Sequence, residues 1–98
     1  MGRFGAVNTY QFSSKYNFDS FMGYLRNTSG WNLYEASDKL YGRLAPEING
    51  AKFDMDWKLE SSTSSSIKLR IDETQLNGRS KDADSVWEKL DALHQRCR

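Results

Sequence analysis

Hydrophobic and polar residues alternate without a break along residues 51–60, and this alternation is the clearest structural signal in the chain. Every second position is apolar, namely Phe53, Met55, Trp57 and Leu59. Since successive side chains of a strand point to opposite faces, the pattern predicts a half-buried strand. Residues 67–72 repeat the alternation, and the serine-rich segment 61–66 forms a polar connector between the two. The simplest arrangement is an antiparallel pair of strands.

The register of this pair depends on the length of the serine loop. One register makes every outward cross-strand pair opposite in charge, namely Asp56 with Lys68, Asp54 with Arg70 and Lys52 with Asp72. A shorter loop opposes like charges instead, namely Lys58 with Lys68 and Asp54 with Asp72. Because like charges directly opposite each other destabilise a sheet, we expect the complementary register and a longer, mobile serine loop.

Three further segments are expected to be strands, namely residues 4–12, 31–36 and 40–45. The dipeptide Asn49-Gly50 stands just before the strand at 51–60, and this residue pair tolerates the positive φ angles of a tight turn. The sequence therefore predicts a hairpin whose connection crosses residues 46–50.

Two segments have the three- and four-residue spacing of an amphipathic helix. The apolar positions of the terminal helix, which starts near Ser80, are Ala83, Val86, Trp87, Leu90, Leu93 and Cys97. Those of a shorter helix are Phe18, Phe21, Met22 and Leu25, and we expect Asn17 to cap it and Gly30 to end it. The order β-α-β-β-β-β-α predicts a small single α+β domain over residues 1–98. Its mainly antiparallel sheet of four to five strands carries both helices on one face.

The composition excludes several function classes. The chain has 98 residues and a formal net charge of +1, from 14 Lys and Arg against 13 Asp and Glu. This length suits one domain, and the balanced charge gives little bulk attraction to phosphate. No run of about 18 apolar residues is present, so we expect no membrane partner. A single Cys cannot form an intrachain disulfide and favours a reducing, cytoplasmic setting.

The residue types that most often carry catalysis are scarce. His94 and Cys97 are the only His and Cys, three residues apart on the predicted terminal helix. Asp91 stands one turn before His94, where it could orient the imidazole. Cys97 belongs to the apolar stripe, and the negative end of a helix raises the pKa of a thiol, which opposes thiolate chemistry. The pair supplies two of the three or four ligands that zinc needs. We therefore expect no enzymatic activity, no metal and no cofactor.

One segment leaves metal-dependent chemistry open as an alternative. Pro46-Glu47 followed by Asp56-Trp57-Lys58 is similar to the Pro-(Asp/Glu), (Asp/Glu)-x-Lys pattern of restriction-endonuclease-like nucleases. The resemblance implies Mg²⁺ held by Glu47 and Asp56, with Lys58 stabilising the attacking water or the developing phosphate charge. Strand alternation places Asp56 and Lys58 on one face, as this chemistry requires. The simpler interpretation is a solvated strand face.

Nucleic-acid binding without catalysis is a further alternative. Residues 77–81, Asn-Gly-Arg-Ser-Lys, are similar to the helix entry of double-stranded RNA-binding domains, and the helix-β-β-β-helix order from residue 18 matches theirs. The resemblance implies basic side chains on phosphates at this helix start. Asp82 and Asp84 replace basic positions expected in that family. The candidate phosphate contacts are Lys68, Arg70, Arg79 and Lys81.

Aromatic residues supply the leading hypothesis, because the tyrosines exceed what a small core holds. Tyr and Trp are the side chains that most often anchor protein interfaces. We expect a non-enzymatic protein-interaction module that acts by surface occlusion, such as a small intracellular inhibitor, an immunity protein or a phage-encoded anti-defence protein. The expected partner-binding residues are Tyr16, Tyr24, Tyr34 and Tyr41, with Arg43 at the rim. Exposed strand edges also leave a homodimer open.

Overall fold

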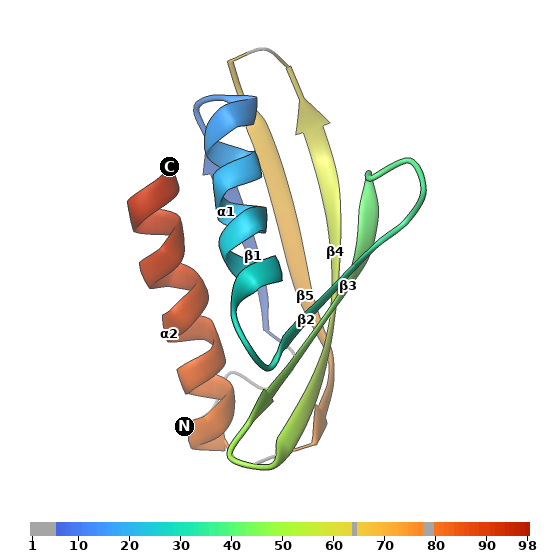
Figure 1. The fold of residues 1–98 in the computed structure, drawn as a ribbon, viewed down its shortest axis with the longest axis vertical. Helices are drawn as coiled ribbons and strands as arrows, with labels where there is room; N and C mark the ends of the chain where they lie inside the picture. The colour runs from blue at the N-terminus through green and yellow to red at the C-terminus, as the bar shows by residue number, and fades with distance from the viewer. Residues whose placement is uncertain (1–5, 64, 78–79) are drawn as a thin grey trace.

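The protein is described by a computed structural model that covers residues 6–63, 65–77 and 80–98 (Figure 1). These residues form a five-stranded sheet and two helices, in the order β1 (Val7–Phe12), α1 (Lys15–Asn27), β2 (Trp31–Glu35), β3 (Tyr41–Ile48), β4 (Ala51–Ser62), β5 (Ile67–Asn77) and α2 (Ser80–Cys97). The strands lie in the order β1-β5-β4-β3-β2, and all neighbours are antiparallel. The predicted α+β class and element order are confirmed.

Both helices cover one face of the sheet, and the sheet curves around them (Figure 1). The core lies between the two layers, because the inward side chains of the strands meet the apolar stripes of α1 and α2 there. Its largest fully buried side chains include Phe12, Phe21, Phe53 and Trp87. Burying such a side chain contributes about 1.5–3 kcal/mol relative to exposure, before the entropy cost of ordering it. The face of the sheet that the helices cover is therefore buried in the core.

The register between β4 and β5 corrects the prediction. The complementary charge pairs expected from the sequence do not form, and the like-charge pairs of the shorter loop do not form either. The observed outward pairs are Asp56 with Asp72 and Lys58 with Arg70. Arg70 still finds an acidic partner, because its Nε donates to Oδ1 of Asp72 at 2.9 Å along the same strand.

The short connection between the two strands accounts for this register. Ser62 lies opposite Ile67, so the ladder of β4 and β5 continues up to the connection, with Trp57 opposite Ile71 on the covered face. A slip of two or four residues would also pair apolar side chains with one another on that face, so the inner face does not select between these registers. Cross-strand charge pairs are each worth about 0.2–1 kcal/mol, whereas a longer loop gives up ladder hydrogen bonds of about 0.5–1.5 kcal/mol each. The outward charges of β4 and β5 therefore meet as like pairs.

The serine-rich connector is also shorter than expected, because β4 extends to Ser62 and β5 starts at Ile67. Thr63 and Ser66 close the loop. The backbone N–H of Thr63 donates to the carbonyl of Ser66 at 2.9 Å, and the N–H of Ser66 donates to Oγ1 of Thr63 at 3.0 Å. The expected length of the loop is therefore wrong: Thr63 and Ser66 close the connection by hydrogen bonds to each other.

The ends of α1 differ from the prediction by a few residues. Ser14 caps the amino end, where its hydroxyl accepts a hydrogen bond from the N–H of Asn17 at 3.1 Å. Asn17, the expected cap, therefore lies inside the helix. Thr28 occupies the C-cap position, and Gly30, the expected end, sits in the turn before β2 with φ of 84°. Both Ser14 and Thr28 satisfy backbone groups that a helix end leaves open.

The β3–β4 hairpin confirms the expected turn. Ile48 pairs with Ala51, so Asn49 and Gly50 alone form the connection, with φ values of 53° and 81°. Positive φ at both central residues is typical of a type I′ turn, whose twist matches that of the flanking strands. Pro46 belongs to β3 rather than to the turn.

Candidate functional site

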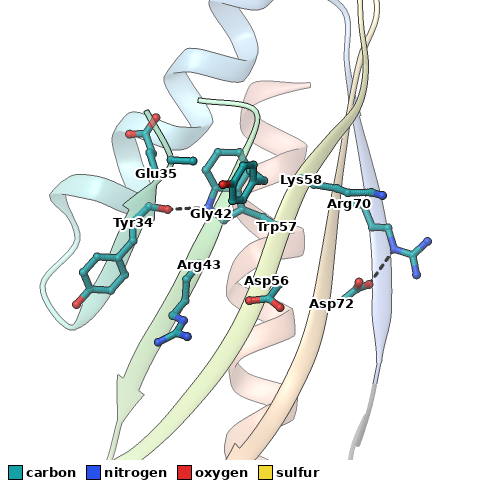
Figure 2. A pocket seen from close by; sticks show the side chains of 11 residues that line it. Tyr34, Glu35, Gly42, Arg43, Asp56, Trp57, Lys58, Arg70 and Asp72 are labelled. Atoms are coloured by element: carbon teal, nitrogen blue, oxygen red, sulfur yellow. Dashed lines mark hydrogen bonds and ion pairs between the residues drawn. The ribbon is translucent and has the colours of Figure 1, made fainter. Parts of the chain in front are cut away.

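The face of the sheet opposite the helices holds the candidate site. Side chains from β2, β3, β4 and β5 line an open hollow of about 890 Å³ on this side, which we call the outer hollow (Figure 2). These strands turn their apolar side chains toward the helices, so the alternation of the sequence leaves polar and charged residues on the other face. Most residues that line the outer hollow are therefore ones that lie outside the core, and the buried Trp57 is the exception.

Six outward side chains form two rows across three adjacent strands. The Lys58 row consists of Tyr41 on β3, Lys58 on β4 and Arg70 on β5. The Asp56 row consists of Arg43 on β3, Asp56 on β4 and Asp72 on β5. Directly opposite residues of antiparallel strands have Cβ atoms about 4.5–5.5 Å apart, so each row is a continuous line of side chains. The two rows lie side by side, two residues apart along every strand.

The charges of the outer hollow are of both signs and are sorted locally. Its charged lining residues are the cations Arg43, Lys58 and Arg70 and the carboxylates Glu35, Asp56 and Asp72, of which Glu35 is already paired with Arg26 of α1. Lys58 and Arg70 are neighbours in one row, and Asp56 and Asp72 are neighbours in the other. The hydrogen bond from Arg70 to Asp72, together with the attraction between their charges, raises the pKa of the Arg70 guanidinium above its ordinary value. The surface thus carries both signs of charge and is polarised along the strands.

Two exposed tyrosines stand at the β2–β3 side of the outer hollow. Tyr34 and Tyr41 each leave 57% of their surface exposed, and Tyr34 lies directly opposite Arg43 in the β2–β3 pair. A tyrosine offers a large, rigid ring and one polar hydroxyl, which suits it to a surface that is covered only when a partner binds. The site therefore combines aromatic and charged groups on one open face.

Gly42 fixes the position of the edge strand that carries Tyr34. A Cβ atom at Gly42 would lie 2.0 Å from the carbonyl oxygen of Tyr34 and 2.7 Å from Nε1 of Trp57. The missing side chain lets the buried indole of Trp57 donate to that carbonyl at 3.1 Å (Figure 2). The bond ties β4 to β2 across β3. A glycine inside a strand pattern is the sequence signal that could have identified this close approach of backbone.

The structure separates the five residues predicted to bind a protein into two groups. Tyr34, Tyr41 and Arg43 meet at the outer hollow. Tyr16 and Tyr24 lie on α1, in the layer on the other side of the sheet. Tyr16 is 78% exposed, whereas the ring of Tyr24 packs against an arginine of α2. A single flat partner surface therefore contacts one group or the other.

The four residues predicted to bind phosphate are not gathered at one place in the part of the chain that the structure describes. Lys68 and Arg70 are both on β5 and point to the outer face, but only Arg70 lines the outer hollow. Arg79 lies outside the described residues, and so does the side chain of Lys81. The guanidinium of Arg70 already forms an ion pair with Asp72.

The three residues of the nuclease-like pattern are also not gathered at one place. Asp56 and Lys58 both line the outer hollow, but Glu47 pairs with Lys52, four residues along β3 from the Arg43 that lies beside Asp56. At about 3.3 Å per residue, this separation is roughly 13 Å. Among the residues with described positions, no group of three or more His, Cys, Asp or Glu is placed to hold a metal ion. The geometry does not bring Glu47 to Asp56.

His94 and Cys97 are engaged in packing. The His94 ring donates through Nε2 to the carbonyl of Gln11 at 2.8 Å, which ties α2 to the edge strand β1. Asp91, expected beside His94, accepts a hydrogen bond from the Tyr10 hydroxyl at 2.7 Å instead. Cys97 is 7% exposed, and burial raises the pKa of its thiol. The predicted direction of that shift is confirmed, with burial as the main cause.

Comparison of the chain with protein-family models, curated proteins and solved structures finds no match. In the described part of the chain, neither helix has the length and apolar character needed to cross a bilayer. The outer face of the sheet is the feature of the described residues that bears on function.

Proposed function

We propose that this chain is a non-enzymatic protein-interaction module that acts by covering a surface of its partner, as a small inhibitor or an immunity protein does. The observation that carries the proposal is the outer hollow, where two exposed tyrosines adjoin charged side chains of both signs on the uncovered face of the sheet. Interface centres favour Tyr and Arg, and charged groups are more frequent at the rim. We assign Tyr34 and Tyr41 as anchors and Arg43 as their polar neighbour.

The charge pattern favours a protein partner over a nucleic acid. A phosphate backbone carries one sign of charge, and a protein binds it by neutralising several phosphates with Lys and Arg. In the outer hollow, such a backbone would meet Asp56 and Asp72 beside every cation of the Lys58 row. A protein surface carries both signs, so it can complement both rows at once.

The test is affinity capture from the native host, followed by titration of the captured protein against two double variants. Tyr34→Ala with Tyr41→Ala removes the outer anchors, and we expect the affinity to fall by about tenfold or more. Tyr16→Ala with Tyr24→Ala is the matched control, because it removes the same side chains from the helical layer. Circular dichroism establishes that each variant is folded.

If the affinity falls for the Tyr16 and Tyr24 variant and not for the Tyr34 and Tyr41 variant, the site lies on α1 and the assignment of the outer face is wrong. Capture of a nucleic acid whose binding falls steeply with salt would favour the phosphate-binding alternative instead.

A further inference from the structure

We propose that a second copy of the same chain is one partner of the outer face. The two copies would pack face to face about a twofold axis that crosses the strands between the Lys58 row and the Asp56 row. The inference rests on the proposed function, because it uses the same face and names a partner for it.

The two rows are complementary under this symmetry. A twofold axis that lies in the interface and runs across the strands reverses the direction of each strand and exchanges the two rows. Lys58 then lies over Asp56 of the second copy, and Arg70 lies over Asp72 of the second copy. Both contacts occur twice because the interface is symmetric. An axis parallel to the strands would instead lay cations on cations, so the charges select one orientation.

The same twofold axis also pairs the outward residues of β3 with each other. Tyr41 and Arg43 are the outward residues of β3 in the two rows, next to Lys58 and Asp56 respectively. The axis that pairs the charges of β4 and β5 lays the Tyr41 ring over Arg43 of the second copy. A guanidinium over the face of a tyrosine ring is a favourable contact. All three strands therefore present a complementary pair at the same two positions.

The register of the sheet supports a role for these rows in association. In an isolated chain, neighbours of like charge such as Asp56 and Asp72 repel each other across the strands. A row of opposite charge laid over them turns that repulsion into attraction, and the attraction strengthens as water leaves the interface. The ion pair between Arg70 and Asp72 neutralises only one end of each row. Lys58 and Asp56 are the central contacts.

One edge of the sheet is less suited to the alternative, in which two copies pair by strand addition. The carbonyl of Gln11 on the edge strand β1 accepts a hydrogen bond from His94 of α2. Asn8 of the same strand donates from its side chain to Asp91 of α2 at 3.3 Å. The terminal helix therefore engages this edge, whereas neither helix lies over the outer face (Figure 1).

Sedimentation velocity of the purified chain tests the proposal first. We expect a concentration-dependent dimer whose dissociation constant is about tenfold higher in 0.5 M than in 0.05 M salt, because screening weakens the facing rows. A chain that stays monomeric at about 1 mM in low salt overturns the proposal.

Reversal of each row tests the geometry. Lys58→Glu with Arg70→Glu makes both rows acidic on β4 and β5, and Asp56→Lys with Asp72→Lys makes both basic. Each variant alone should dimerise about a hundredfold more weakly than the parent, since like charges then face each other. An equal mixture should recover a heterodimer, visible by native mass spectrometry. The control is Lys52→Glu with Lys89→Glu, which makes the same change in net charge at exposed positions outside the rows and should leave dimerisation unchanged.

Two outcomes would contradict the face-to-face arrangement. A dimer that persists in both reversed variants would use another surface, such as a strand edge. Reversed variants that stay monomeric when mixed would also overturn it. If a double variant fails to fold by circular dichroism, Lys58→Glu and Asp56→Lys carry the same mixing test with one change each.

The two proposals fail separately. If the chain is monomeric but the Tyr34 and Tyr41 double variant still loses a captured protein, only the second copy is excluded. If neither self-association nor capture depends on the outer face, the proposed function fails as well.

Discussion

The two faces of the sheet come from the same strands but follow opposite rules. On β4, Trp57 is 3% exposed and lies against the core, while its neighbours Asp56 and Lys58 point into the outer hollow. The inner face pairs apolar with apolar across β4 and β5, and the outer face pairs like charge with like charge. The inner face determines which side of each strand is buried, and the short connection between β4 and β5 determines their register. The outer face bears an electrostatic cost, which a partner can remove.

The largest expected difference between the faces is in stability. Trp57→Ala removes a buried indole and its hydrogen bond to Tyr34, so we expect the free energy of unfolding to fall by about 3–5 kcal/mol. Lys58→Ala, one residue further along the strand, should change it by less than about 0.5 kcal/mol. Urea denaturation of both variants measures the contrast. Similar losses in the two variants would show that the faces are not energetically distinct.

A second, smaller effect tests the link between the faces at Gly42. Gly42→Ala places a methyl group against the Tyr34 carbonyl and the Trp57 indole, so overpacking and the lost hydrogen bond should cost about 2–4 kcal/mol. Gly23→Ala is the control, because nothing lies within 4 Å of a Cβ there and alanine favours a helix interior by about 0.5–1 kcal/mol. Destabilisation by Gly23→Ala and not by Gly42→Ala would contradict this account of the β2 edge.

The inner face is the part of the fold that sequence reasoning predicts best. The alternation along residues 51–60 predicts which side of β4 is buried, and the apolar stripe from Ala83 to Cys97 predicts the covered side of α2. The predicted register is wrong because charge pairing on the outer face is too weak to lengthen the connection between β4 and β5. A strand slipped by two residues keeps its alternation, so periodicity alone cannot separate such registers.

The outer face was predicted only as separate residues. Tyr34, Arg43 and Asp56 each appeared as a candidate, under two different hypotheses, and the pairing of β2, β3 and β4 brings them together. Local sequence does not encode which strands become neighbours. The predicted partner-binding set also contains Tyr16, because an exposed tyrosine on a helix and one on a strand look alike in the sequence.

The alkaline stability of the protein tests the burial of Cys97 at the helical side. Burial raises the pKa of this thiol in the folded state above its ordinary value of about 8.5. Its contribution to stability is therefore complete below that pH, where the unfolded chain also holds the proton. It is lost as the pH rises through the folded pKa. The difference in unfolding free energy between the parent and Cys97→Ala should shrink between about pH 8 and pH 10. A pH-independent difference would indicate an accessible thiol.

The smallest expected effect has the opposite sign to the others. Lys58→Gln removes the repulsion with Arg70 in the Lys58 row, whose third residue Tyr41 carries no charge, so we expect the unfolding free energy to rise by about 0.2–0.5 kcal/mol. Lys52→Gln is the matched control on the same strand, because Lys52 lies opposite Glu47 and its substitution removes an attraction instead. Urea denaturation in low salt, where exposed charges are least screened, resolves such a difference best.

The same Lys58→Gln variant should associate more weakly with a second copy, because the central contact to Asp56 of the second copy loses its charge. A substitution that stabilises the chain and weakens its association would show that this face is not optimised for folding. An unchanged dimer in the more stable variant would leave the like-charge rows without a binding role. The ammonium group that Lys58 places beside Arg70 would then be only a consequence of the register of β4 and β5.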